Sequence, residues 1–90
     1  MEFLLKKQYL MNCFDKALEE ESLFVGIAVQ RKNHKKPTLI VIHAVDIERS
    51  REQFNLVYDD DLINRRVKTQ RVVGFSHADS LAELQGYLLK

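Results

Sequence analysis

The pattern of apolar and polar positions along the chain predicts both helices and strands. From residue 3 to residue 18, apolar side chains recur every three or four positions, with lysine and aspartate between them, as in an amphipathic helix. Residues 23–30 and 38–45 are rich in Val and Ile, which is typical of strands. Because the polar stretch RKNHKKP separates the two segments, we expect a β-hairpin with a long loop.

The first predicted strand has two unequal faces. Val25, Ile27 and Val29 alternate onto one face and supply bulk for a core. Gly26 and Ala28 fall on the other face, where their small size would let a helix approach closely. We therefore expect both faces of this strand to be covered.

A second helix is predicted after the hairpin. Asp46 offers an N-cap oxygen, and the apolar spacing, which includes Phe54 and Leu62, suits a helix of about four to five turns. Arg65 and Arg66 would lie at its C-terminal end, where cations interact favourably with the helix dipole.

A third strand and a third helix complete the chain. The segment KTQRVVGFSHA, residues 68–78, reads as a strand with Val73 and Val72 on opposite faces. Ser80 and Glu83 have the spacing of a capping box, which predicts that a last helix begins at this serine.

The element order α-β-β-α-β-α predicts a single small α+β domain over residues 1–90, with a three-stranded mixed sheet packed with helices. The second helix would form a crossover connection between the second and third strands. The third strand would then lie next to the second strand and run parallel to it. The first strand would be antiparallel to both. Because so small a sheet exposes its edges, a homodimer is among the expected assemblies.

Composition narrows the class of protein. A hydrophobic share of 46% with three Gly and one Pro is ordinary for a compact domain. The lone Cys13 cannot form an internal disulfide, and the first residues, MEFLLKKQYLM, lack the pattern of a secretion signal, so we expect a cytoplasmic protein. No apolar run is long enough to cross a bilayer, and we expect no membrane association.

The stretch GFSHA comes close to the G-x-S-x-G turn that presents a serine nucleophile in hydrolases. Its fifth position is Ala78, however, and the only histidine that follows Ser76 is the adjacent His77, which on a strand points to the opposite face. The chain also lacks a glycine-rich phosphate loop. We therefore expect no enzyme activity and no cofactor.

Four residues near the ends of the second and third strands form the one candidate metal or acid–base site. They are His43, His77, Asp46 and Asp79. The grouping requires the two strands to be neighbours, and each residue also has an ordinary structural explanation as a backbone-bonded histidine or a capping aspartate. We therefore expect no bound metal.

The predicted topology brings two basic segments to one end of the molecule. The hairpin loop RKNHKK and the stretch NRRVK after the second helix would lie together, and acidic residues would gather at the opposite end. The residues that would contact a partner are Arg31, Lys32, Lys35, Lys36, Arg65, Arg66 and Lys68.

These features favour a non-enzymatic interaction or regulatory module that binds a protein partner. Small size and a charged surface would suit an accessory protein of a phage or other mobile element that acts on a host factor. The alternative is a nucleic-acid-binding protein that uses the hairpin tip and the basic stretch near residues 65–68. Against it, the net charge is only +1 and no aromatic residue alternates with the bases as a stacking platform.

Overall fold

The computed structural model describes residues 6–88 and has the predicted α+β composition and order. Its elements are α1 (Lys7–Glu19), β1 (Phe24–Gln30), β2 (Thr38–His43), the 3₁₀ turn η1 (Ala44–Asp46), α2 (Ile47–Val57), β3 (Arg71–Ala78) and α3 (Leu81–Leu88). The predicted helical residues 3–5 lie outside the described part of the chain. Within that part, every helix is too short or too polar to cross a membrane.

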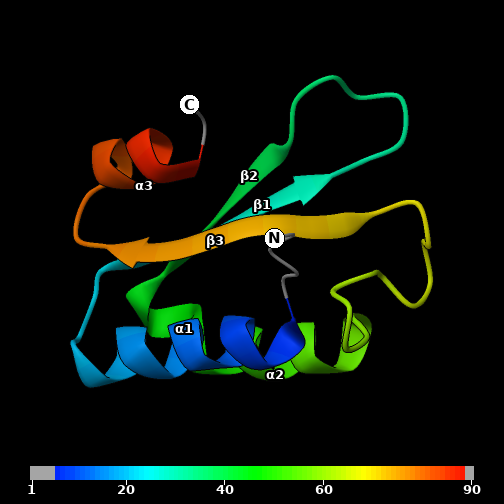
Figure 1. Cartoon of the computed structure of the whole chain (residues 1–90). Helices are drawn as coiled ribbons and strands as arrows, with labels where there is room; N and C mark the ends of the chain where they lie inside the picture. Colours follow the sequence, from blue (N-terminus) through cyan, green and yellow to red (C-terminus); the bar gives the residue numbers. More distant parts are fainter. Residues whose placement is uncertain (1–5, 89–90) are drawn as a thin grey trace, which may run out of the picture.

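The elements form three layers (Figure 1). The sheet lies in the middle, with α1 and α2 on one face and α3 on the other. The strand order is β2-β1-β3, and β1 is antiparallel to both neighbours. The prediction of a mixed sheet was therefore wrong: β3 runs in the same direction as β2 but pairs with β1. In this order β1 has a hydrogen-bonded neighbour on each side. This satisfies the backbone polar groups of β1, whose five central residues are all buried.

The main core lies between the sheet and helices α1 and α2. Leu10 and Phe14, from the apolar stripe of α1, are fully buried against Val25 and Ile27 of β1. The ring of Phe54 on α2 contacts that of Phe14, with centroids 6.0 Å apart. The apolar side chains that recur at helical spacing in α1 and those that alternate along β1 thus form one apolar layer.

α3 packs closely on the opposite face of the sheet. A β-carbon on Gly26 would come within 3.0 Å of side-chain carbons of both Leu84 and Leu88, so the predicted close helix approach is confirmed. The hydroxyl oxygen of Ser80 accepts a hydrogen bond from the backbone N–H of Glu83 at 3.2 Å, which confirms the predicted cap.

The second helix is shorter than predicted. α2 ends at Val57, and the chain then turns so that Leu62 has a left-handed φ of 63°. Three successive aspartates follow, and negative charge near a helix C-terminus opposes the helix dipole. The Asp59 carboxylate instead accepts hydrogen bonds from the N–H groups of Asp61 and Ile63, which stabilise a turn. Arg65 and Arg66 therefore lie in a loop.

The register of β3 changes at a bulge opposite Ala28 and Val29. Because of it, Val72 is paired with Val29 and is buried in the main core, whereas Val73 is 38% exposed. A bulge places one extra residue on a strand. The regular alternation of side chains between the two faces, predicted for the whole segment, is therefore interrupted in the first half of β3.

Candidate interaction surface

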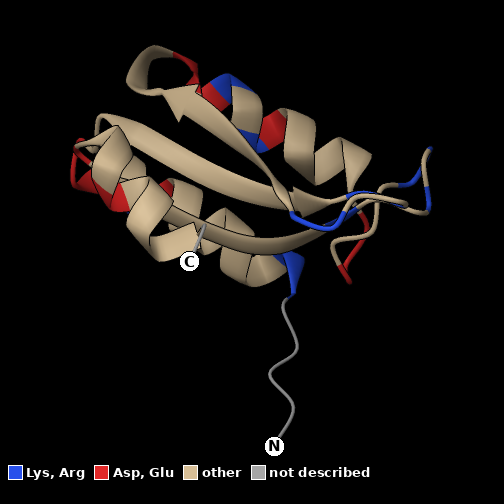
Figure 2. Ribbon diagram, turned by 90° about the horizontal axis from the view of Figure 1, so that it is seen from above, with Lys and Arg blue, Asp and Glu red and all other residues tan. Residues whose placement is uncertain are grey.

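The two predicted basic segments do lie at one end of the molecule. Gln30, the last residue of β1, pairs with Arg71, the first residue of β3, which brings the loops next to these strand ends together. We call this surface the basic end, and its residues are Arg31, Lys32, Lys35, Lys36, Arg65, Arg66 and Lys68. All seven are exposed, and Figure 2 shows their two segments together beyond the sheet.

The close contacts of the neighbouring aspartates are with groups outside the basic end. Lys6 pairs with Asp61, which raises the pKa of the lysine, and Lys7 Nζ lies 3.8 Å from a carboxylate oxygen of Asp60. Backbone N–H donors, and after them the positive charges of Arg65 and Lys68, lower the pKa of Asp59 below its ordinary value of 3.8. Within residues 6–88, no ion pair joins any of the seven basic-end side chains to a carboxylate. These side chains are therefore exposed without a close ion pair, and Arg65 and Lys68 lie within electrostatic reach of the Asp59 carboxylate.

Polar side chains hold the two loops of the basic end in shape. Asn64, 9% exposed, accepts hydrogen bonds at its Oδ1 from the N–H groups of Arg66 and Val67 at 2.9 and 3.0 Å. In the hairpin loop, Gln30 Nε2 donates to the carbonyl of His34 at 2.6 Å. Sequence reasoning missed both positions, although an asparagine directly before RRVK is a recognisable turn signal.

The candidate metal residues are not brought together. His43 pairs with Phe24 and His77 pairs with Val25, which are successive residues of β1. Because successive residues of a strand point to opposite faces, the two histidines lie on opposite faces of the sheet with β1 between them. The described residues contain no group of three or more potential metal ligands.

Each of these four residues instead has a local partner. The His43 ring packs edge-on against Phe24, with centroids 5.3 Å apart. Asp46 forms an ion pair with Arg49 rather than the predicted helix cap, and Asp79 accepts a hydrogen bond from a backbone N–H at 3.2 Å.

His77 lies between a serine and a carboxylate whose contact with it no sequence pattern predicts. Its Nδ1 is 2.9 Å from Ser22 Oγ, and its Nε2 is 3.8 Å from Glu20 Oε2. These are the residue types of a hydrolytic triad, but Ser22 is only 5% exposed, so a substrate has no access to its oxygen. The contacts join the end of α1 to the end of β3.

The thiol of Cys13 also lacks the properties of a nucleophile. Burial raises the pKa of this thiol to about 11. It is therefore protonated at neutral pH, and the thiolate that nucleophilic chemistry needs is scarce.

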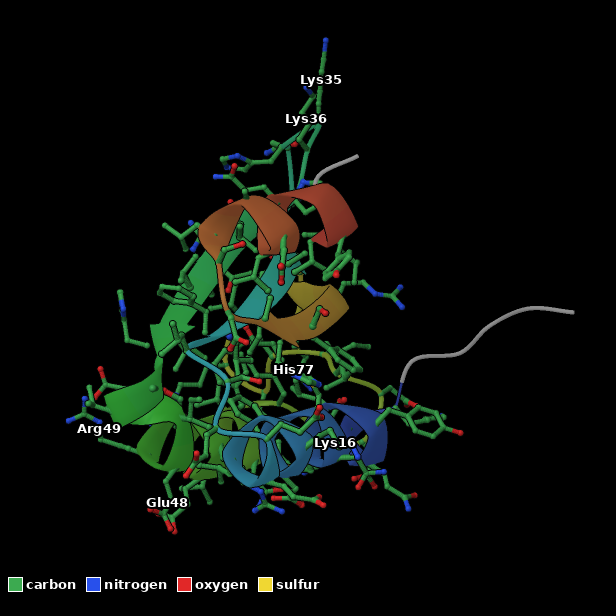
Figure 3. All side chains as sticks on the ribbon, turned by 90° about the vertical axis from the view of Figure 1, so that its left-hand side faces the viewer. Lys16, Lys35, Lys36, Glu48, Arg49 and His77 are labelled. Carbon is green, nitrogen blue, oxygen red and sulfur yellow. The ribbon has the colours of Figure 1, made fainter. Side chains whose placement is uncertain are left out.

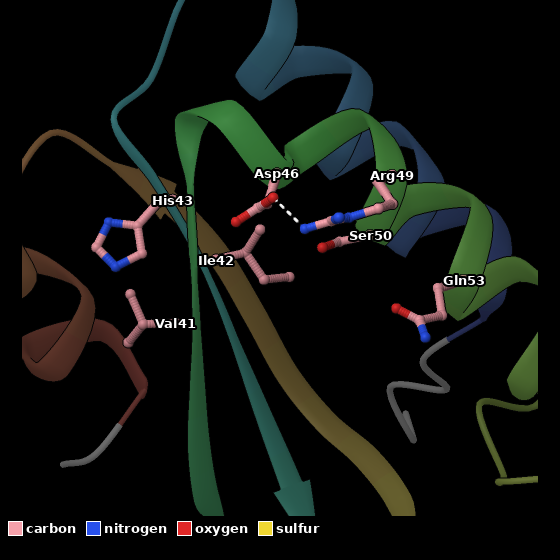
Figure 4. A pocket seen from close by; sticks show the side chains of 7 residues that line it. All are labelled: Val41, Ile42, His43, Asp46, Arg49, Ser50 and Gln53. Carbon is pink, nitrogen blue, oxygen red and sulfur yellow. Dashed lines mark hydrogen bonds and ion pairs between the residues drawn. The ribbon is translucent and has the colours of Figure 1, made fainter.

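A groove of about 340 Å³ runs beside β2 (Figure 4). It lies between this strand and α2 and is lined by Val41, Ile42, His43, Asp46, Arg49, Ser50 and Gln53. A smaller hollow of about 180 Å³ continues along α2 from Gln53 to Tyr58. Sequence reasoning missed this groove because it depends on β2 being an edge strand.

Comparisons with family models, with curated proteins and with solved structures find no match to this chain.

Proposed function

We propose that the protein is a non-enzymatic interaction module whose basic end binds an acidic segment of a partner protein. The observation that carries the proposal is the set of seven exposed cations without ion pairs in the described chain, next to aspartates that Lys6, Lys7 and backbone donors engage. Such a surface attracts negative charge and speeds encounter with an acidic partner. The bonds from Asn64 and Gln30 support it, because a loop already held in shape loses less entropy on binding.

Nucleic-acid binding is the second candidate. It is favoured by the hairpin loop, which extends beyond the sheet (Figure 1) and contains four cations that could contact phosphates. The protein partner is preferred because the segments RKNHKK and RRVK contain no Phe, Tyr or Trp on which bases could stack.

A titration with three fluorescent probes tests the proposal and separates the candidates. The probes are a short oligoglutamate peptide, a single-stranded oligonucleotide and a duplex, each titrated at low salt and at about 0.15 M salt. We expect peptide binding that weakens as salt rises. If either nucleic acid binds more tightly than the peptide at the higher salt concentration, the second candidate is favoured. If no probe binds at low salt, both candidates are overturned.

Matched variants locate the binding surface. The triple variant Arg65→Ser/Arg66→Ser/Lys68→Ser should weaken peptide binding about tenfold or more, because each lost charge contact removes part of the attraction. The control triple variant replaces Lys16, Arg49 and Arg51, which lie on α1 and α2, with serine. It lowers net charge equally, so an equal loss of affinity in the control would show that overall charge and not the basic end binds the probe.

A further inference from the structure

The outer edge of β2 has backbone groups that point away from the sheet. Within residues 6–88, β2 pairs with β1 along one edge and with no strand along the other. The N–H of Ala44 donates to the carbonyl of Leu23 at 2.9 Å, which fixes the alternation of hydrogen-bonded pairs in this ladder. Counting back in twos from Ala44, the N–H and C=O groups of Leu39, Val41 and His43 lie between the bonded positions and therefore point outward.

This edge lacks the usual protection against a further strand. Edge strands in soluble proteins commonly carry a charged residue, a proline or a bulge. From Thr38 to Ile42 β2 contains none of these, and Pro37 stands only at its start. The opposite edge of the sheet, β3, carries a bulge, and its first residue, Arg71, forms a bridge with Ile63. β2 is therefore the edge that is open to strand addition.

The charges on either side of β2 are complementary to each other (Figure 3). Lys35 and Lys36 project before the strand begins, and Glu48 and Arg49 follow its end. Asp46, which is in an ion pair with Arg49, also follows the strand, so this end keeps a net negative charge. If a second copy of β2 runs antiparallel to the first, the start of each strand lies beside the end of the other. The two lysines of each chain then face the two carboxylates of the other, and the symmetry makes this contact twice.

We infer that the protein forms a homodimer in which β2 of two copies pair antiparallel about a two-fold axis near Val41. In this register Val41 lies opposite its own counterpart, and Leu39 lies opposite His43 of the second copy. All three outward-pointing backbone positions then gain partners, and the two three-stranded sheets become one continuous sheet. The inference goes beyond the proposed function, with which it shares Lys35 and Lys36 of the hairpin loop.

The groove beside β2 accommodates the second strand. On the α2 side of the sheet, Ile40 of the second copy would lie next to Ile42 and point toward the groove floor at Ser50 and Gln53. Apolar contact there adds to the backbone hydrogen bonds. Ile40 itself is only partly buried, so dimerisation would cover it.

Sedimentation velocity of the full chain from about 1 µM to 1 mM tests the inference, a range suited to the small area of a short edge contact. We expect a concentration-dependent rise from 10.6 kDa toward twice this mass. Val41→Lys should raise the dimer dissociation constant about tenfold or more, because two lysines would meet at the axis. The matched control, Val73→Lys, places the same charge on β3 and should leave dimerisation unchanged, and circular dichroism checks that both variants fold.

A charge exchange on exposed residues keeps the test decisive if Val41→Lys unfolds the protein. The double variants Lys35→Glu/Lys36→Glu and Asp46→Lys/Glu48→Lys should each weaken the dimer, and the combined variant should restore it. A wild-type chain that stays monomeric at 1 mM, a dimer sensitive to Val73→Lys alone, or a combined variant that fails to recover would each overturn the inference. Variants of Arg65, Arg66 and Lys68 leave this contact untouched, so its failure is distinguishable from failure of the proposed function.

Discussion

At the scale of single residues, two glycines differ in what an added methyl group would contact. Gly26→Ala would bring the methyl group to 3.0 Å from methyl carbons of Leu84 and Leu88, so these side chains must shift by a few tenths of an ångström. Gly86 lies within α3, and beyond the helix's own backbone and its chain neighbours no atom of residues 6–88 lies within 4 Å of the same position. The two sites therefore separate the cost of crowding from the gain in helix propensity.

We predict opposite effects on stability. Gly26→Ala should lower the free energy of unfolding by about 1–2 kcal/mol through overpacking. Gly86→Ala should raise it by about 0.5–1 kcal/mol, since alanine favours a helix more than glycine does. Urea denaturation measures both values, and a stabilising Gly26→Ala would contradict the close contact between α3 and β1.

Residue-level features were predictable where chemistry acts locally. The small residue at position 26 and the cap at Ser80 were both visible in the sequence and are confirmed. The bond between Ser22 and His77 joins residues far apart in the chain, and no local pattern signals such a contact. Asp46 shows the limit of a local rule, because its ion pair with Arg49 replaces the expected cap.

At the scale of elements, α1 ends in a way that favours glycine. Glu21, just beyond its end, has a φ of 54°, and the N–H groups of Glu21 and Ser22 donate back to the carbonyls of Leu18 and Ala17. This bond pair defines a Schellman motif, whose left-handed position is usually glycine.

Glu21→Gly should therefore stabilise the protein by up to about 1 kcal/mol, because a left-handed conformation is strained for a residue with a β-carbon. The control is Glu21→Ala, which removes the same charge but keeps a β-carbon at the left-handed position. Thermal unfolding compares the two, and an equal change in both melting temperatures would assign the effect to charge.

The order of the strands could not be read from the chain. Apolar alternation marks residues 24–30 and 71–78 as strands, but it does not state which edges meet. The connection through α2 allows β3 to pair with either edge of the hairpin, and the buried central position of β1 decides the outcome in the fold. The separation of His43 from His77 follows from this one choice.

At the scale of the whole molecule, the separation of charge follows from topology. The hairpin turn and the loop before β3 must lie at the same end because both neighbours of β1 run antiparallel to it. This placement was predicted correctly, although the predicted pairing of β2 with β3 was wrong. The placement depends only on β2 and β3 running in the same direction, because both strands then start at the end of the sheet where β1 ends. The edge groove, in contrast, exists only in the observed strand order.

The most direct test of the basic end is a residue-resolved binding map. Nuclear magnetic resonance spectra of the ¹⁵N-labelled protein, titrated with the oligoglutamate peptide, report which backbone amides change environment. The account predicts the largest shifts in residues 31–36 and 65–68, reduced at about 1 M salt, where screening is strong. Unchanged signals in both segments, or the largest shifts in residues 44–48 after the end of β2, would contradict it.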